Sequence, residues 1–159
     1  MTRSFDRSFL SRVRTLAGCA PALARRSAPR HPTGPILIAD DQRDQTDSMA
    51  VLFELTGHAV LRAYSGAMAL ELAEAFRPRW LLLDLVMPAL TGCEVAERVR
   101  LSPWRQGARL LAITGFGRAE DRERAFAAGF DHYFLKPVDF GELTAVMQEP
   151  RLPAALSEN

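Results

Sequence analysis

The stretch Trp80-Leu-Leu-Leu-Asp84-Leu-Val-Met-Pro88 decides the fold. Four apolar residues in succession, with no polar alternation, are typical of a short strand that is buried on both faces of a parallel sheet. The run ends at an acidic residue, and Pro88 interrupts the segment soon afterwards. A strand of this kind needs helices on both faces of its sheet, so the flanking sequence should alternate between strands and helices.

The flanking sequence does alternate in this way from residue 36 to residue 148. Further short apolar runs predict strands at residues 36–39, 58–63, 109–113 and 132–135. Amphipathic segments predict helices at residues 43–55, 66–76, 93–101, 119–128 and 140–148. Ser65 is a good N-cap, and Gly57 and Gly129 follow the ends of two helices. The pattern predicts an α/β fold, a doubly wound five-stranded parallel sheet with helices on both faces.

Polar side chains come directly after four of these five strands. They are Asp40, Asp41, Asp84, Thr114 and Lys136. Because the carboxyl ends of parallel strands meet at one edge of the sheet, we expect these side chains to lie together. Three carboxylates in one crevice repel each other, which favours a bound cation, and hard oxygen ligands suit Mg²⁺.

The same cluster predicts phosphoryl transfer. A carboxylate can attack phosphorus directly, and Asp84 is the best-placed nucleophile. A phosphoryl group in transfer spreads negative charge over its oxygens, so catalysis needs positive charge and hydrogen-bond donors. Mg²⁺ and Lys136 would supply the charge, and Thr114 a hydroxyl donor. Each motif alone is more often a turn or a helix cap, so the prediction depends on their joint placement.

The motifs Asp40-Asp41, Asp84-Leu-Val-Met-Pro88, Thr114-Gly115 and Lys136-Pro137 resemble the signature set of response-regulator receiver domains of two-component systems, over residues 35–148. The resemblance implies a flavodoxin-like strand order, 2-1-3-4-5, and phosphorylation of Asp84. It implies that Asp41 ligates Mg²⁺ directly and Asp40 largely through water, with the carbonyl of Val86 completing the metal sphere. The donor would be a sensor histidine kinase or a histidine phosphotransfer protein.

The resemblance also assigns roles around the phosphorylation site. Thr114 and Tyr133 would form the switch pair, with the Thr moving onto the phosphoryl group and the aromatic ring turning inward. The side chains of Val86 and Phe116 would border the approach of the hydrolytic water. A cis peptide bond is expected before Pro137. The segments Ile113-Thr-Gly-Phe-Gly117 and Gly129-Phe-Asp-His-Tyr-Phe-Leu-Lys-Pro-Val-Asp139 further resemble receivers attached to hybrid sensor histidine kinases.

Charge divides the chain into an arm and a domain. Residues 1–33 carry seven arginines against one acidic residue, a charge of +6, which leaves −5 for the rest because the whole chain carries +1. We expect a flexible basic arm at 1–33, the receiver domain at 34–149 and a short tail at 150–159. Apolar residues near helical spacing favour one short amphipathic helix at residues 4–18. The arm could lack a specific role, dock a partner, or contact a membrane surface or nucleic acid.

Several classes of protein are disfavoured by the sequence. No apolar run reaches the roughly 18 residues of a membrane span, and no secretory signal begins the chain, so a cytoplasmic protein is expected. Cys19 and Cys93 are expected to be free thiols. Only eleven residues follow residue 148, which is too few for a helix-turn-helix, so we expect no DNA-binding output domain.

Two alternatives remain open at this stage. One is a binding module with the receiver fold that is never phosphorylated. The other is a haloacid-dehalogenase-type phosphatase, but that family places Asp-x-Asp after its first strand, whereas this chain has adjacent aspartates. The favoured prediction is a single-domain phosphorelay receiver, which is not an enzyme apart from catalysing its own phosphorylation and dephosphorylation.

Overall fold

A computed structural model describes residues 34–115 and 117–148. The expected helix at residues 4–18, the tail at 150–159, Cys19 and Phe116 lie outside the described residues. In chain order the elements are β1 (Ile36–Ala39), α2 (Arg43–Leu55), β2 (Val60–Ala63), α3 (Gly66–Phe76), β3 (Trp80–Leu83), α4 (Gly92–Leu101), a 3₁₀ helix (Arg105–Gly107), β4 (Arg109–Thr114), α5 (Ala119–Ala128), β5 (His132–Leu135) and α6 (Phe140–Gln148).

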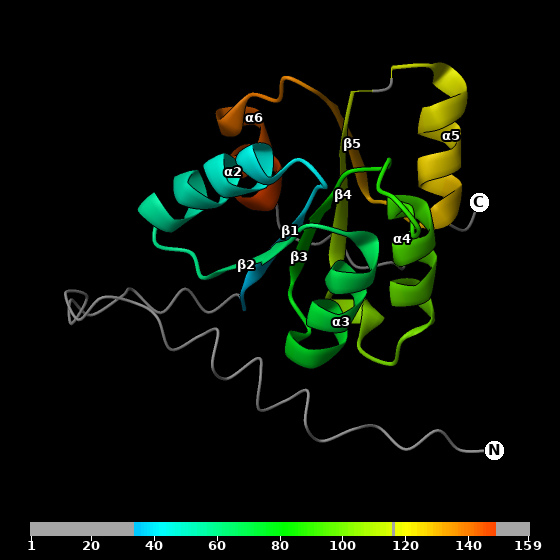
Figure 1. Ribbon diagram of the computed structural model, residues 1–159, viewed down its shortest axis with the longest axis horizontal. Helices are drawn as coiled ribbons and strands as arrows, with labels where there is room; N and C mark the ends of the chain where they lie inside the picture. Colours follow the sequence, from blue (N-terminus) through cyan, green and yellow to red (C-terminus); the bar gives the residue numbers. More distant parts are fainter. Residues whose placement is uncertain (1–33, 116, 149–159) are drawn as a thin grey trace, which may run out of the picture. The chain divides into compact units, whose positions relative to one another are not determined.

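The strands form one parallel sheet in the order β2-β1-β3-β4-β5, which confirms the predicted order. Figure 1 shows the sheet with helices on either side of it. Ile36 at the start of β1 pairs with Val60 on one side and with Trp80 on the other. The register therefore brings the carboxyl ends of β1 and β3 side by side, where Ala39 is opposite Leu83.

Two apolar layers cover the two faces of the sheet. Alternate residues of each strand point to opposite faces, so Ile36 and Ile38 pack with α2 and α6, whereas Leu37 and Ala39 pack with α3, α4 and α5. All four residues of β1 and all four of β3 are buried. Burial on both faces explains why these strands read as unbroken apolar runs in the sequence.

Three predicted boundaries were wrong by one or two residues. β2 begins at Val60, not at residue 58, because the backbone N–H of His58 donates to the carbonyl of Phe53 and stays with the end of α2. α4 begins at Gly92, one residue early, because Thr91 caps it in a capping box with Glu94. β4 runs one residue further than predicted, through Thr114.

A single arginine joins two connections at the amino ends of the strands. The guanidinium of Arg100, on α4, donates to the carbonyls of Gly129 and Ala108 at 2.8 and 3.1 Å. It also forms an ion pair with Asp131 at 2.7 Å. The same Asp131 carboxylate accepts from the N–H of Leu110 at 2.8 Å. Arg100 thereby ties α4 to the segments that lead into β4 and β5.

Two further expectations concern the described part of the chain. No helix within it is long and apolar enough to cross a membrane. Cys93 is a free thiol, as predicted. Burial raises the pKa of the Cys93 thiol above its ordinary value.

Candidate functional site

Asp84 is held in place from both sides of its backbone. Its N–H donates to the carbonyl of Ala39 at 2.9 Å, which continues the pairing of β3 with β1 by one residue. Behind it, a Cβ on Gly92 would overlap the carbonyl oxygen of Asp84, so the first residue of α4 packs directly on the acidic residue. The Asp84 carboxylate is buried, and its Oδ1 accepts from the N–H of Val86 at 3.2 Å.

Asp40 and Asp41 follow β1 and differ sharply in exposure. Asp40 is buried, and its Oδ1 accepts from the N–H of Gln42 at 2.8 Å at the start of α2. Its carbonyl accepts from the hydroxyl of Thr46 at 3.1 Å. Asp41 is exposed. Asp40 therefore supports the turn into α2, whereas the Asp41 carboxylate is open to solvent.

Lys136 links the two buried carboxylates. Its Nζ lies 2.5 Å from Oδ2 of Asp40 and 2.8 Å from Oδ2 of Asp84. The N–H of Lys136 donates to the carbonyl of Thr114 at 2.9 Å, which continues the pairing of β5 with β4. The peptide bond before Pro137 is cis, as the resemblance implied. Burial lowers the pKa of Lys136, but the hydrogen bonds to both carboxylates outweigh it and raise the pKa above its ordinary value.

The three carboxylates form one cluster with the chemistry of a magnesium site. Asp40, Asp41 and Asp84 each offer an oxygen, and these oxygens lie within 4.8 Å of one another. Lys136 contributes one positive charge against three negative charges, so the cluster keeps an excess of negative charge. Hard, negatively charged oxygens in a partly open crevice suit Mg²⁺. The residues present therefore fit the cation that the sequence predicts.

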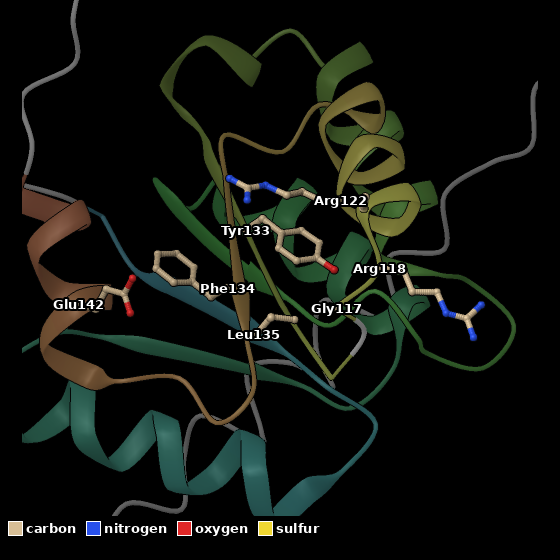
Figure 2. A pocket seen from close by; sticks show the side chains of 8 residues that line it. Gly117, Arg118, Arg122, Tyr133, Phe134, Leu135 and Glu142 are labelled. Atoms are coloured by element: carbon tan, nitrogen blue, oxygen red, sulfur yellow. The ribbon is translucent and has the colours of Figure 1, made fainter.

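Thr114 and Tyr133 occupy neighbouring strands. Thr114 ends β4 and is fully buried. Tyr133 projects from β5 toward α5, while Phe134 projects to the other side, toward Glu142 of α6 (Figure 2). The Tyr133 ring lines a pocket of about 520 Å³ that none of the three carboxylates lines. Burial raises the pKa of Tyr133 above its ordinary value. The ring thus lies on the α5 side of β5, next to the strand that ends at Thr114.

Val86 and Phe116 are the two residues expected to border the approach of the hydrolytic water. Val86 lies in the connection after Asp84, and 52% of its surface is exposed. Its N–H contacts the Asp84 carboxylate, as described above. Phe116 lies outside the described residues, so its role remains a prediction.

Two supporting residues were not identified as parts of the site from the sequence. Thr46 lies within the helix predicted at residues 43–55, and its hydroxyl donates to the carbonyl of Asp40. Gly92 directly precedes the helix predicted at residues 93–101, and its lack of a side chain allows α4 to pack against Asp84. A Thr six positions after the Asp that ends a strand, within a helix, could have suggested the first contact. The sequence holds no local signal for the second.

Comparison with known proteins identifies the class. Residues 36–148 match the family described as the response regulator receiver domain, and the chain belongs to that family. It is 28% identical to the CheY-like response regulator receiver domain protein of Methanospirillum hungatei, with a TM-score of 0.67, and the match covers 72% of this chain and 90% of that one. The match decides between the receiver and the phosphatase in favour of the receiver.

Two sequence relatives illustrate the range of proteins that carry this domain. An uncharacterized 14.6 kDa protein of Leptolyngbya boryana is 37% identical over 114 residues, which are 72% of this chain and 87% of that protein. The DNA-binding dual master transcriptional regulator RpaA of Synechocystis is 32% identical over 110 residues, which are 69% of this chain and 46% of RpaA. The chain therefore matches less than half of the length of RpaA.

Proposed function

We propose that this receiver domain accepts a phosphoryl group on Asp84, with Mg²⁺, from a sensor histidine kinase or a histidine phosphotransfer protein. The observation that carries the proposal is the position of Lys136, whose Nζ contacts the carboxylates of Asp40 and Asp84 together. A cation at this point can neutralise charge on the acceptor and on an incoming phosphoryl group. The fold supplies the remaining groups at the same edge of the sheet.

The transfer step follows from the chemistry of a carboxylate nucleophile. A lone pair on an Asp84 oxygen forms a bond to phosphorus, and the bond from phosphorus to the donor atom breaks. The donor atom leaves with the bonding electron pair, so the product is an acyl phosphate on Asp84. Lys136 offsets the negative charge on the phosphoryl oxygens, and the hydroxyl of Thr114 donates a hydrogen bond to one of them.

The metal would be held by Asp40, Asp41, Asp84 and the carbonyl of Val86. When bound, Mg²⁺ supplies positive charge that offsets the charge of the phosphoryl oxygens. The Asp41 carboxylate is exposed to solvent. The Asp40 carboxylate instead forms an ion pair with Lys136 and accepts a hydrogen bond from the N–H of Gln42. We assign the direct contact to Asp41 for this reason, and the water-mediated contact to Asp40.

The response to phosphorylation would begin at Thr114. Movement of its hydroxyl toward the phosphoryl group would leave space behind it on the α5 side of the sheet. Tyr133 lies on that side of the adjacent strand, and its ring would turn toward the space. The domain would then present a changed surface along β5 and α5 to its partner. Residues 34–149 would be the unit that changes.

The direct test is incubation with acetyl phosphate and Mg²⁺, followed by intact mass spectrometry and peptide mapping. One added phosphoryl group per chain, mapped to Asp84, is the expected result. A chain that takes up no phosphoryl group from acetyl phosphate or from any histidine phosphodonor would instead be a binding module with the receiver fold.

Replacing Asp41 with Asn should lower the affinity for Mg²⁺ by at least about tenfold, since even outer-shell contacts of a metal site contribute that much. Asp41 is exposed, so the free energy of unfolding without metal should change by no more than about 0.5 kcal/mol. Calorimetric titration with Mg²⁺ measures the first effect and thermal denaturation the second. Asp44→Asn, in the first turn of α2, is the control. Equal Mg²⁺ affinity in the Asp41 and Asp44 variants would remove Asp41 from the ligand set.

Replacing Val86 with Asn should shorten the lifetime of the acyl phosphate. The exposed Val86 side chain cannot orient a water molecule, whereas an amide can hold one by a hydrogen bond of about 1 kcal/mol, which corresponds to roughly fivefold faster hydrolysis. The decay of the phosphorylated form after removal of the donor measures the effect. Val86→Leu, which adds no polar group, should leave the decay rate unchanged. An Asn variant that decays like the Leu variant would show that position 86 does not control the water.

A further inference from the structure

The end of the sheet opposite the carboxylates carries exposed apolar side chains. Each helix follows a strand and returns toward the amino ends of the strands, so α2, α3 and α4 all finish there; α3 and α4 descend to the lower edge of the domain in Figure 1. Their last residues are Leu55, Phe76 and Leu101, which are 79%, 44% and 82% exposed. Single exposed apolar residues are ordinary on protein surfaces. Three helices that each end in an exposed apolar residue at the same end of the sheet instead indicate an interaction surface.

The same end carries four arginines without acidic partners. Arg79 and Arg109 flank Trp80, with their guanidinium carbons 6.0 and 5.6 Å from the centroid of its ring system. Arg77 and Arg105, in the neighbouring connections, are exposed. None of the four forms an ion pair with a residue in the described ranges. We call these four arginines, together with Leu55, Phe76 and Leu101, the amino-end surface.

Nearby acidic side chains are already engaged. Asp131 is paired with Arg100, and Glu54 with Arg62 at 2.9 Å. Glu74 accepts from the hydroxyl of Ser102 and from the indole N–H of Trp104. Asp131 and Glu54 are each paired with an arginine outside the amino-end surface, whereas Glu74, which is held by neutral donors, keeps its charge and offsets one of the four arginines.

The arginine-rich arm is attached at this end. Gly34 and Pro35 lead into Ile36, the first residue of β1, which pairs with Trp80. Residues 1–33, which carry seven arginines and one acidic residue, precede Gly34 in the sequence. The carboxylate cluster is at the other end of the same strands, so the charges of the two ends are opposite in sign.

We infer that the amino-end surface docks on an anionic lipid bilayer surface, with the carboxylate cluster facing away from it. A partner for this surface has to offer both negative charge and an apolar environment. Nucleic acid offers phosphates but stacks its apolar bases inside, so exposed leucines would gain little there. A bilayer with anionic headgroups offers both, because basic side chains bind the headgroups and apolar side chains enter the headgroup–acyl boundary. Phosphoryl transfer at the opposite end would remain accessible to a soluble donor.

The test uses the full chain and two kinds of vesicle, phosphatidylcholine alone and phosphatidylcholine mixed with phosphatidylglycerol. Cosedimentation should show binding to the mixed vesicles only, weakened by added salt. Replacing Arg77 with Asn and Arg105 with Gln together should lower the binding constant by at least about tenfold, since each basic residue near such a surface contributes about fivefold. Asn suits position 77, where φ is 49°. Replacing Leu55 and Leu101 with Ser should lower it by about tenfold as well.

Matched controls come from the opposite end of the domain. Arg118→Gln with Arg122→Gln removes the same charge near the start of α5, and Leu135→Ser removes an apolar side chain that is 50% exposed. These controls should bind the mixed vesicles like the unaltered chain. Equal binding by the amino-end variants would overturn the inference. Loss of binding to duplex DNA in the arginine variants, with normal vesicle binding, would replace the bilayer by nucleic acid. Uptake of phosphoryl groups from acetyl phosphate should stay unchanged in all amino-end variants, so this test is independent of the proposed function.

Discussion

Replacing Asp84 with Asn should abolish stable phosphoryl uptake while leaving the domain folded. The amide is nearly isosteric with the carboxylate, and its oxygen can still accept from Lys136, but its nitrogen lone pair is delocalised and does not attack phosphorus. The N–H of Val86 would lose its acceptor, and one of three crowded carboxylates would disappear, so we expect a net change in the free energy of unfolding of about 1 kcal/mol or less. Intact mass spectrometry after incubation with acetyl phosphate and Mg²⁺ measures uptake.

The control for this variant is Asp47→Asn, which removes an exposed carboxylate on α2 outside the cluster. That variant should take up one phosphoryl group, as the unaltered chain should. A phosphoryl adduct that persists in the Asp84 variant would show that another residue is the acceptor. Thermal denaturation separates this result from loss of the fold, since an unfolded variant would also fail to be phosphorylated.

Replacing Lys136 with Met should greatly slow phosphorylation and also destabilise the domain when no metal is added. Met fills a similar volume but leaves the buried carboxylates of Asp40 and Asp84 without their shared cation. Breaking a buried pair by removing one partner typically costs 3–5 kcal/mol, and the partial exposure of Lys136 reduces the expected loss to about 2 kcal/mol. Chemical denaturation measures the loss, and addition of Mg²⁺ should recover part of it, because the cation offsets the same repulsion.

The pH dependence of this effect has a definite sign. The pKa of Lys136 in the folded domain is raised above its ordinary value of 10.5. The stabilisation is therefore fully present below that value and is lost as the pH rises through the folded-state pKa. The difference in stability between the unaltered chain and the Met variant should be constant near neutral pH and should shrink only in strongly alkaline buffer. Lys136→Arg keeps the charge and should lose less stability than Lys136→Met; equal losses would show that packing, not charge, is the cause.

The sequence predicted the fold because its strands are buried on both faces. Unbroken apolar runs such as residues 80–83 suit a strand that helices cover on both faces. The acidic residue after this run marks the end of the strand. The strand boundary at residue 58 was less clear, since neither His58 nor Ala59 is a residue type that marks a turn. Their assignment to a connection depends on a bond from His58 to the end of α2, which no local pattern announces.

The candidate site was predictable as a set of residues but not as a set of contacts. The resemblance named Asp40, Asp84 and Lys136, and the parallel sheet places their backbones at the same edge. That one ammonium group contacts both carboxylates depends on side-chain torsions, and the sequence does not specify them. The same is true of Gly92, whose role appears only when α4 is placed against the backbone of Asp84.

The Arg100 contacts have a consequence for how the domain opens. One planar guanidinium satisfies two carbonyls and a carboxylate that belong to the connections before β4 and before β5. These segments cannot separate one at a time without leaving a charged donor unpaired, so they open together or not at all. The least costly excursions from the native state then fall at the other end of the strands, in the connections that follow Asp84, Thr114 and Lys136. We therefore expect slow exchange of amide hydrogens at the Arg100 end and faster exchange at the end where the proposed phosphoryl group would bind.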